Sequence, residues 1–211
     1  MVRRLTRRGS KPTASGLAPA SGNRKVVEQS DLFPLLFDGL DSVGGLTVFD
    51  AGPAVPETVD FFAQFKCRLI FADLLSDLPT DEREDDGVED VDFGKLLTYP
   101  IETRFDICLF WDFLNYLDLK MLRAFNLALT PYIHDDTRAH CFGRFSTKSP
   151  VTSQQFGIRS IDELVVRDQP ANLQPCYPHG YADLRDTLGC FRFSRSKLLQ
   201  EGRLEILMYA S

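Results

Sequence analysis

Apolar residues occur along this chain as short continuous runs that alternate with helically spaced sets. The continuous runs are typical of strands buried on both faces of a parallel sheet, and they cover residues 46–50, 67–73, 105–112 and 138–145. Apolar positions at helical spacing follow the first three runs, at residues 56–65, 93–97 and 115–129. Pro56 suits the first position of a helix. This alternation of strand and helix predicts an α/β fold.

The last third of the chain carries a different pattern. Residues 181–188 predict a helix, and residues 190–196 and 203–210 alternate apolar and polar positions as two terminal strands do. Residues 156–170 fit either a hairpin or a short helix, and within them we favour extended structure at residues 163–167. Together these elements predict a three-layer, Rossmann-like sheet of about seven strands with helices on both faces. The sheet is expected to be mostly parallel, with an antiparallel last strand.

Charge divides the chain into a basic segment and an acidic body. Residues 1–25 contain seven Lys and Arg residues and no acid, among many Ser, Gly and Pro residues, so we predict a disordered basic tail. Residues 26–211 form the predicted domain and carry a formal net charge of −13, since the whole chain carries −6. An acidic domain repels the phosphate backbone, so nucleic-acid binding is not expected except through the tail. The acid-rich segment 76–92 predicts a solvated loop.

Cysteine and histidine spacing favours neither a disulfide framework nor a metal site. The five cysteines are widely spaced, form no CxxC pair and do not cluster with the three histidines. Reduced thiols of this kind are typical of cytoplasmic proteins, and we predict a cytoplasmic location. No apolar run approaches the ~20 residues that cross a bilayer, and no apolar segment follows the basic N-terminal residues as in a secretory signal. We therefore expect no membrane association; the oligomeric state stays open.

Four stretches of the sequence carry a family resemblance. They are VFDAGPAVP, LIFADL, FDICLFWDFLNYL and, at the end of the chain, LGCFRF followed by GRLEILMYA. Their order resembles that of the class I S-adenosylmethionine-dependent methyltransferases, from about residue 46 to residue 209, with a degenerate glycine motif. The resemblance implies S-adenosylmethionine as the cofactor. It also implies methyl transfer to a small-molecule or protein acceptor of unknown identity.

The resemblance implies a set of cofactor-binding residues, namely Asp50, Gly52, Asp73, Asp92, Trp111 and Asp112. By the family pattern, Asp50 and Gly52 lie at the methionine end of the cofactor, and Asp73 accepts both ribose hydroxyls. From the residues alone, Asp50 equally suits a cap for the turn, and Asp73 an N-cap for the segment that follows.

The remaining predicted residues also have competing structural interpretations. Asp92 would hold the adenine amine with Phe93 against the ring, but an acid in so charged a segment is also typical of a solvated loop. Trp111 and Asp112 would lie where cofactor and acceptor meet, although a Trp in an apolar run is equally a core aromatic. A catalytic base, if one is needed, has four candidates of equal merit: Asp112, Tyr116, His140 and His179.

The turn after the first strand departs from the family's glycine-rich pattern. Where that pattern has three alternating glycines after the acid, this chain has Gly52, Ala54 and Pro56. Glycine there permits a positive φ angle and a close approach of the backbone to a ligand, so Ala54 is expected to hinder cofactor binding. The sequence therefore supports two functions: a methyltransferase, and a catalytically degenerate protein of the same fold that acts as a binding or regulatory partner. A dinucleotide-dependent oxidoreductase fits less well, because of the terminal strand pair and the missing glycines.

Overall fold

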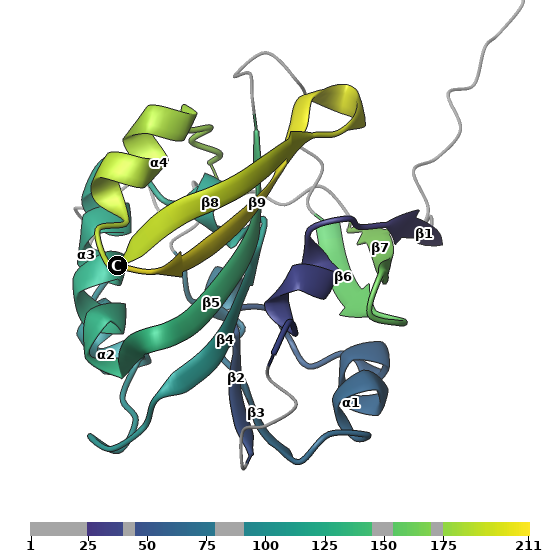
Figure 1. Cartoon of the computed structure of the whole chain (residues 1–211). Helices are drawn as coiled ribbons and strands as arrows, with labels where there is room; N and C mark the ends of the chain where they lie inside the picture. The colour runs from purple at the N-terminus through teal and green to yellow at the C-terminus, as the bar shows by residue number, and fades with distance from the viewer. Residues whose placement is uncertain (1–24, 40–44, 79–90, 145–153, 170–174) are drawn as a thin grey trace, which may run out of the picture.

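The computed structural model describes residues 25–39, 45–78, 91–144, 154–169 and 175–211. Its centre is a six-stranded sheet in the order β3-β2-β4-β5-β9-β8 (Figure 1). The strands are β2 (Leu46–Asp50), β3 (Cys67–Phe71), β4 (Phe105–Trp111), β5 (Ile133–Arg144), β8 (Phe191–Leu198) and β9 (Arg203–Ala210). β9 is antiparallel to both of its neighbours, whereas the other strands share one direction. This mixed, mostly parallel sheet with a reversed last strand confirms the predicted fold class, although the described residues give the main sheet six strands where about seven were predicted.

Helices cover one face of this sheet. They are α2 (Phe93–Leu96), α3 (Leu119–Leu129) and α4 (Tyr181–Thr187), which lie together on the left of Figure 1. The core on this side joins Phe110 of β4 to Phe125 of α3 and Leu184 of α4. α3 begins where the side chain of Asp118 accepts a hydrogen bond from the backbone N–H of Met121 at 2.7 Å, which satisfies one of the free donors of its first turn.

The opposite face is covered by a mixture of helix and strand. The elements are η1 (Phe33–Leu36), α1 (Pro56–Phe62), and a three-stranded antiparallel sheet of β1 (Lys25–Gln29), β7 (Glu163–Asp168) and β6 (Gln154–Ile158). The short helix η3 (Leu74–Asp77) packs instead into the first core, through Leu74. The second core joins Val48 and Leu109 of the main sheet to Phe62 of α1 and to Phe156 and Val166 of the small sheet. The prediction of helices on both faces is thus only half right, because a small sheet takes much of the second layer. The extended structure favoured at residues 163–167 is present as β7.

Two elements differ most in extent from their sequence-based predictions. The helix predicted over residues 115–129 divides into η4 (Phe113–Tyr116) and α3. Asn115 accounts for the break, because its side-chain amide donates to the backbone oxygens of Asp112 and Phe142, at 2.9 and 2.8 Å, and so holds the first turn against β5. β5 begins at Ile133, before the apolar run at residues 138–145 that predicted it.

The predicted basic tail lies outside the described residues except for Lys25. That residue is the first of β1, and its ammonium group contacts the carboxylate of Glu57 at 3.1 Å. Most of the acidic segment, residues 79–90, also lies outside the described part of the chain. No helix among the residues described is long and apolar enough to span a membrane.

Candidate functional site

The carboxyl ends of β2 and β4 meet at the position where the strand order of the sheet reverses. β2 pairs with β3 on one side and β4 on the other, which makes this edge the place where an open α/β sheet binds ligands. Asp50 ends β2 and Trp111 ends β4. The indole N–H of Trp111 donates to Oδ1 of Asp50 at 2.7 Å, and the same oxygen accepts the backbone N–H of Gly52 at 2.8 Å. Three of the predicted residues are therefore in direct contact with one another.

Burial changes the chemistry of the Asp50 carboxyl group. Its side chain is among the buried polar groups of the structure, and this burial raises the pKa of Asp50 to about 7. The hydrogen bonds from Gly52 and Trp111 act in the opposite direction but do not offset the desolvation. At neutral pH a substantial fraction of this group is consequently a neutral acid.

Trp111 is held in an unusual conformation by aromatic packing. Its φ angle is +49°, in the left-handed region that bulky residues rarely adopt. The ring is 4% exposed and stacks on Phe156 of β6 at 5.4 Å and on Phe33 of η1 at 6.2 Å. These contacts direct the indole across the end of the sheet onto the turn that follows β2.

The turn after β2 is covered by protein groups at both of its ends. A Cβ atom on Gly52 would lie 3.2 Å from the Trp111 ring and 3.2 Å from Oδ1 of Asp50. At the other end, Val55 is the N-cap of α1 and is buried, and a Cβ on Gly157 of β6 would lie 3.3 Å from its side chain. The glycine of this turn thus accommodates the indole of Trp111.

Ala54 does not adopt the positive φ that a glycine would permit here, so it places no backbone strain on the turn, and its expected effect on cofactor binding stays a prediction. Among the residues described, Asp73 and Trp111 are the non-glycine residues with positive φ, and Ala54 is exposed. Gly52 does not adopt a positive φ either. Its role is therefore to let the Trp111 ring and the Asp50 carboxyl group approach the backbone closely, and not to give the backbone conformational freedom. Pro56 is the first residue of α1, as its preference for that position predicts.

Gly52→Ala is expected to lower the free energy of unfolding by about 1–3 kcal/mol, because the added methyl group must displace the Trp111 ring or the Asp50 carboxyl group. Ala54→Gly is the matched control in the same turn and is expected to change stability by less than about 1 kcal/mol. Urea titration followed by circular dichroism measures both. Equal stabilities for Gly52→Ala and wild type would contradict the close packing at this turn.

Asp73 follows β3 and lies beside the same turn. Its φ and ψ angles are both 43°, and its backbone N–H donates to the oxygen of Gly52 at 3.2 Å. Its side chain is half-buried, and Oδ2 accepts the hydroxyl of Ser76 at 3.0 Å. Asp73 stands at the N-cap position of η3, as the competing interpretation expects, but its side chain accepts the hydroxyl of Ser76 and no backbone N–H of the helix. The carboxylate also stays accessible enough to meet a ligand.

Asp92 and Phe93 lie apart from this contact. The side chain of Asp92 is 54% exposed and pairs with Lys95 at 3.2 Å, which agrees with a solvated charge at the start of α2. The ring of Phe93 is buried against Phe125 at 5.5 Å. An adenine ring could reach it only by displacing core side chains.

Asp112 belongs to a second polar cluster, on the other side of β4. Burial raises the pKa of Asp112 to about 6, although the charge of Arg144 and the hydroxyl of Tyr116 act to lower it. The Tyr116 hydroxyl lies 3.4 Å from Oδ2 of Asp112. Two of the four candidate bases are therefore neighbours, both buried in the described part of the chain.

The two histidine candidates have structural partners. His140 of β5 is fully buried, and its Nε2 lies 2.9 Å from Oε1 of Glu205 on β9, which also accepts the hydroxyl of Ser30. Burial would raise the pKa of Glu205, but the hydrogen bond and charge of His140 outweigh it and leave the pKa lowered. His179 donates from Nε2 to the oxygen of Leu117 at 2.6 Å.

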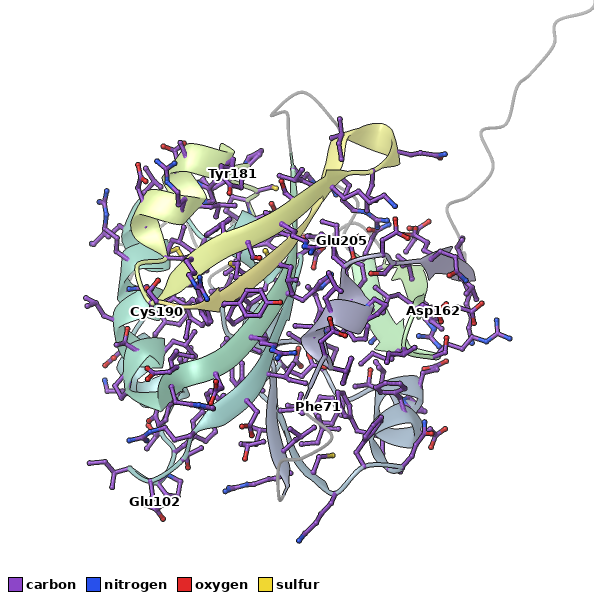
Figure 2. The ribbon with its side chains drawn as sticks, viewed as in Figure 1. Phe71, Glu102, Asp162, Tyr181, Cys190 and Glu205 are labelled. Atoms are coloured by element: carbon purple, nitrogen blue, oxygen red, sulfur yellow. The ribbon has the colours of Figure 1, made fainter. Side chains whose placement is uncertain are left out.

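Sequence reasoning missed the Ser30–Glu205–His140 cluster. Figure 2 shows Glu205 on β9, on the face that carries the small sheet. The one hint of a buried polar group was the acid within the otherwise apolar strand RLEILMYA. The alternating pattern of that strand, however, favours an exposed position for Glu205. Its partners come from distant parts of the chain, so no local pattern reveals the burial.

A cavity of about 330 Å³ lies at the opposite edge of the main sheet. Its lining includes Asn126 of α3, His134 at the start of β5, and Cys190 before β8. None of the six predicted cofactor residues lines it. Because the chemistry implied by the resemblance belongs at the carboxyl ends of the strands, this cavity is separate from the candidate site.

Comparison with known proteins gives likeness in structure only. No protein-family model matches the sequence, and no curated protein is significantly similar to it. Among solved structures, the glycopeptide N-methyltransferase MtfA with bound S-adenosyl-L-methionine is 11% identical, with a TM-score of 0.44 over 84% of this chain and 92% of that one.

Other structural matches are of the same kind. The Burkholderia thailandensis 1,6-didemethyltoxoflavin-N1-methyltransferase, with bound 1,6-didemethyltoxoflavin and S-adenosylhomocysteine, is 14% identical, covering 85% of this chain and 76% of that one at a TM-score of 0.49. The PH0226 protein of Pyrococcus horikoshii OT3 is 10% identical. The match covers 85% of this chain and 88% of that one, with a TM-score of 0.49. Structural matches to S-adenosylmethionine-dependent methyltransferases thus span most of the chain. At these identities and scores they carry no inference about activity.

Proposed function

We propose that this chain is a catalytically degenerate protein of the methyltransferase fold, which binds a partner and does not transfer methyl groups. The observation that carries the proposal is the contact between Trp111 and Asp50 at the switch point of the sheet. The indole occupies the space above Gly52 where the resemblance would put the methionine end of the cofactor. The acid and the glycine of the motif are kept, but both now serve this internal contact.

Opening a crevice for the cofactor between the Trp111 ring and the turn after β2 would cost free energy. The Trp111 ring would have to leave its stacks on Phe33 and Phe156 and give up its hydrogen bond to Asp50. Truncating a buried Trp costs about 3–5 kcal/mol, and displacing one forfeits a comparable share of that packing. A cost of about 3 kcal/mol would lower the apparent cofactor affinity by about 100-fold.

S-adenosylmethionine-dependent methyl transfer is the second candidate function, and the position of Asp73 favours it. This half-buried carboxylate lies at the end of β3 next to the Gly52 turn. A carboxylate there suits bidentate hydrogen bonding to two ribose hydroxyls. Methyl transfer would then rely on positioning and desolvation of the two reactants at this edge of the sheet. The acceptor and any catalytic base would still have to be identified.

Calorimetric titration with S-adenosylmethionine and S-adenosylhomocysteine tests the proposal. Wild-type protein is expected to give no binding heat at ligand concentrations up to about 1 mM. Trp111 is the only tryptophan of the chain, so its fluorescence reports directly on the crevice. We expect its emission to stay unchanged on titration, whereas entry of a ligand at Gly52 would move the ring toward water and shift the emission to longer wavelength.

Micromolar binding together with an emission shift would overturn the proposal. Asp73→Ala then identifies the site, because loss of a charged hydrogen-bonding group is expected to weaken binding by at least about tenfold. Asp92→Ala removes the same charge from an exposed position at the start of α2 and is the matched control. If both variants bind the cofactor with the wild-type affinity, the cofactor binds elsewhere on the molecule.

A further inference from the structure

The two edges of the main sheet differ in how they are protected. β8 forms one edge, carries Arg192, Arg195 and Lys197, and has an irregular register against β9. Charges and register breaks of this kind keep edge strands from pairing with other chains. β3 forms the other edge, with the sequence CRLIF, and Arg68 is its single charged residue. β3 is therefore the less protected edge.

The backbone of β3 offers hydrogen-bonding groups on its outer side. The oxygen of Lys66 accepts from Leu46, and the N–H of Ala72 donates to Asp50, so the even-numbered residues of β3 face β2. Alternation then turns the N–H and C=O groups of Cys67, Leu69 and Phe71 outward. Within the described ranges, no strand pairs with this outer side.

The charges that flank β3 select the direction of a partner. Lys66 and Arg68 are exposed at its amino end, and Asp73 follows its carboxyl end. A second copy of β3 in the antiparallel direction would place the basic end of one strand beside the acidic end of the other. A parallel partner would instead bring like charges together.

We propose that β3 pairs with β3 of a second copy of this chain, in an antiparallel dimer that joins the two main sheets. Leu69 lies opposite itself across the two-fold axis, and Cys67 lies opposite Phe71 of the second copy. This register uses the outward groups of all three residues, because hydrogen-bonded pairs in an antiparallel ladder recur at every second residue. Figure 2 marks Phe71 at the end of the strand.

The surface beside β3 adds apolar area to this interface. Phe65, two residues before the strand, is 37% exposed, and Val59 of α1 is 44% exposed. α1 contacts β3 on the face where Cys67 and Leu69 lie, and the ring of Phe65 packs against Phe61 and Phe62 of α1. A five-residue strand buries less area than a standard interface of about 1,200–2,000 Å², so a concentration-dependent dimer is expected.

Sedimentation equilibrium over protein concentrations up to about 500 µM tests the dimer. The wild-type protein is expected to change from monomer to dimer as its concentration rises. Phe71→Pro removes an outward N–H group that β2 does not use, and it is expected to weaken association at least about tenfold. Phe71→Ala is the matched control, which removes the ring but keeps the N–H group, and it should weaken association less.

A charge exchange tests the direction of pairing without changing the strand itself. Lys66→Glu is expected to weaken the dimer, because position 66 lies opposite residue 72 of the second copy, next to Asp73 in the chain. Adding Asp73→Lys to Lys66→Glu should restore association toward the wild-type value. A protein that stays monomeric at the highest concentration overturns the inference. The inference is also overturned if Phe71→Pro and Lys66→Glu both form a dimer as strong as that of the wild-type protein.

Discussion

Trp111→Ala is expected to lower the free energy of unfolding by about 3–5 kcal/mol, the range for truncating a buried Trp. The loss has two sources that can be separated. One is the aromatic packing on Phe33 and Phe156, and the other is the hydrogen bond to Asp50. Trp111→Phe keeps much of the packing and removes the donor, so it should cost about 1–3 kcal/mol. Denaturant titration of the three proteins gives these differences.

Trp111→Gly is the control for the backbone of this residue. Glycine adopts a positive φ without penalty, so this variant relieves the strain at +49° while it removes the ring. It should therefore be no less stable than Trp111→Ala. If Trp111→Ala unfolds within about 1 kcal/mol of the wild type, the ring is not held as the structure has it, and the closed-crevice proposal loses its main support.

The stability of the wild-type protein is expected to fall as pH rises from about 4 to about 7, because of Asp50. Its folded-state pKa of about 7 lies above the ordinary value of 3.8 for an aspartate, so over this interval the folded state holds a proton that the unfolded state has released. Each pKa unit corresponds to about 1.4 kcal/mol, which gives a loss on the order of 4 kcal/mol. Asp112, raised to about 6, acts in the same direction.

Asp50→Asn isolates this contribution. The asparagine resembles the neutral acid, and its oxygen can accept the same two N–H donors from Gly52 and Trp111. Between pH 4 and 7, the free energy of unfolding of the variant should therefore change by several kcal/mol less than that of the wild type. Asp92→Asn, at an exposed carboxylate, should leave the wild-type pH dependence unchanged. Parallel curves for Asp50→Asn and wild type would show that Asp50 titrates normally.

Local patterns in the sequence were sufficient to predict most of the main sheet. The apolar runs that end at Asp50 and Trp111 became neighbouring parallel strands, and parallel strands end at the same edge. This is why residues 61 positions apart could be expected at one site. The direction of β9 followed from the terminal strand pair and is confirmed.

The contacts that decide the site were not readable in the same way. The direction of the Trp111 side chain depends on one positive φ angle and on rings from η1 and β6. Glu205 follows an alternating pattern that favours exposure, yet Ser30 and His140 enclose it. Such contacts join segments far apart in the chain. Neither residue propensity nor hydrophobic periodicity indicates which distant segment will pack against a given residue.

The small sheet imposes an order on folding during synthesis. β1 pairs with β7, where Gln29 contacts Glu163 across 134 positions, and Ser30 contacts Glu205 across 175. A ribosome that adds about 5–20 residues per second needs roughly 10–35 s to make the segment between Ser30 and Glu205. β1 has no strand partner until β7 is made, 134 positions after Gln29, so its pairing waits for about three quarters of the chain. Phe156 of β6, which stacks on Trp111, also follows Trp111 in the chain, so the ring is covered on this side only after β6 has been made.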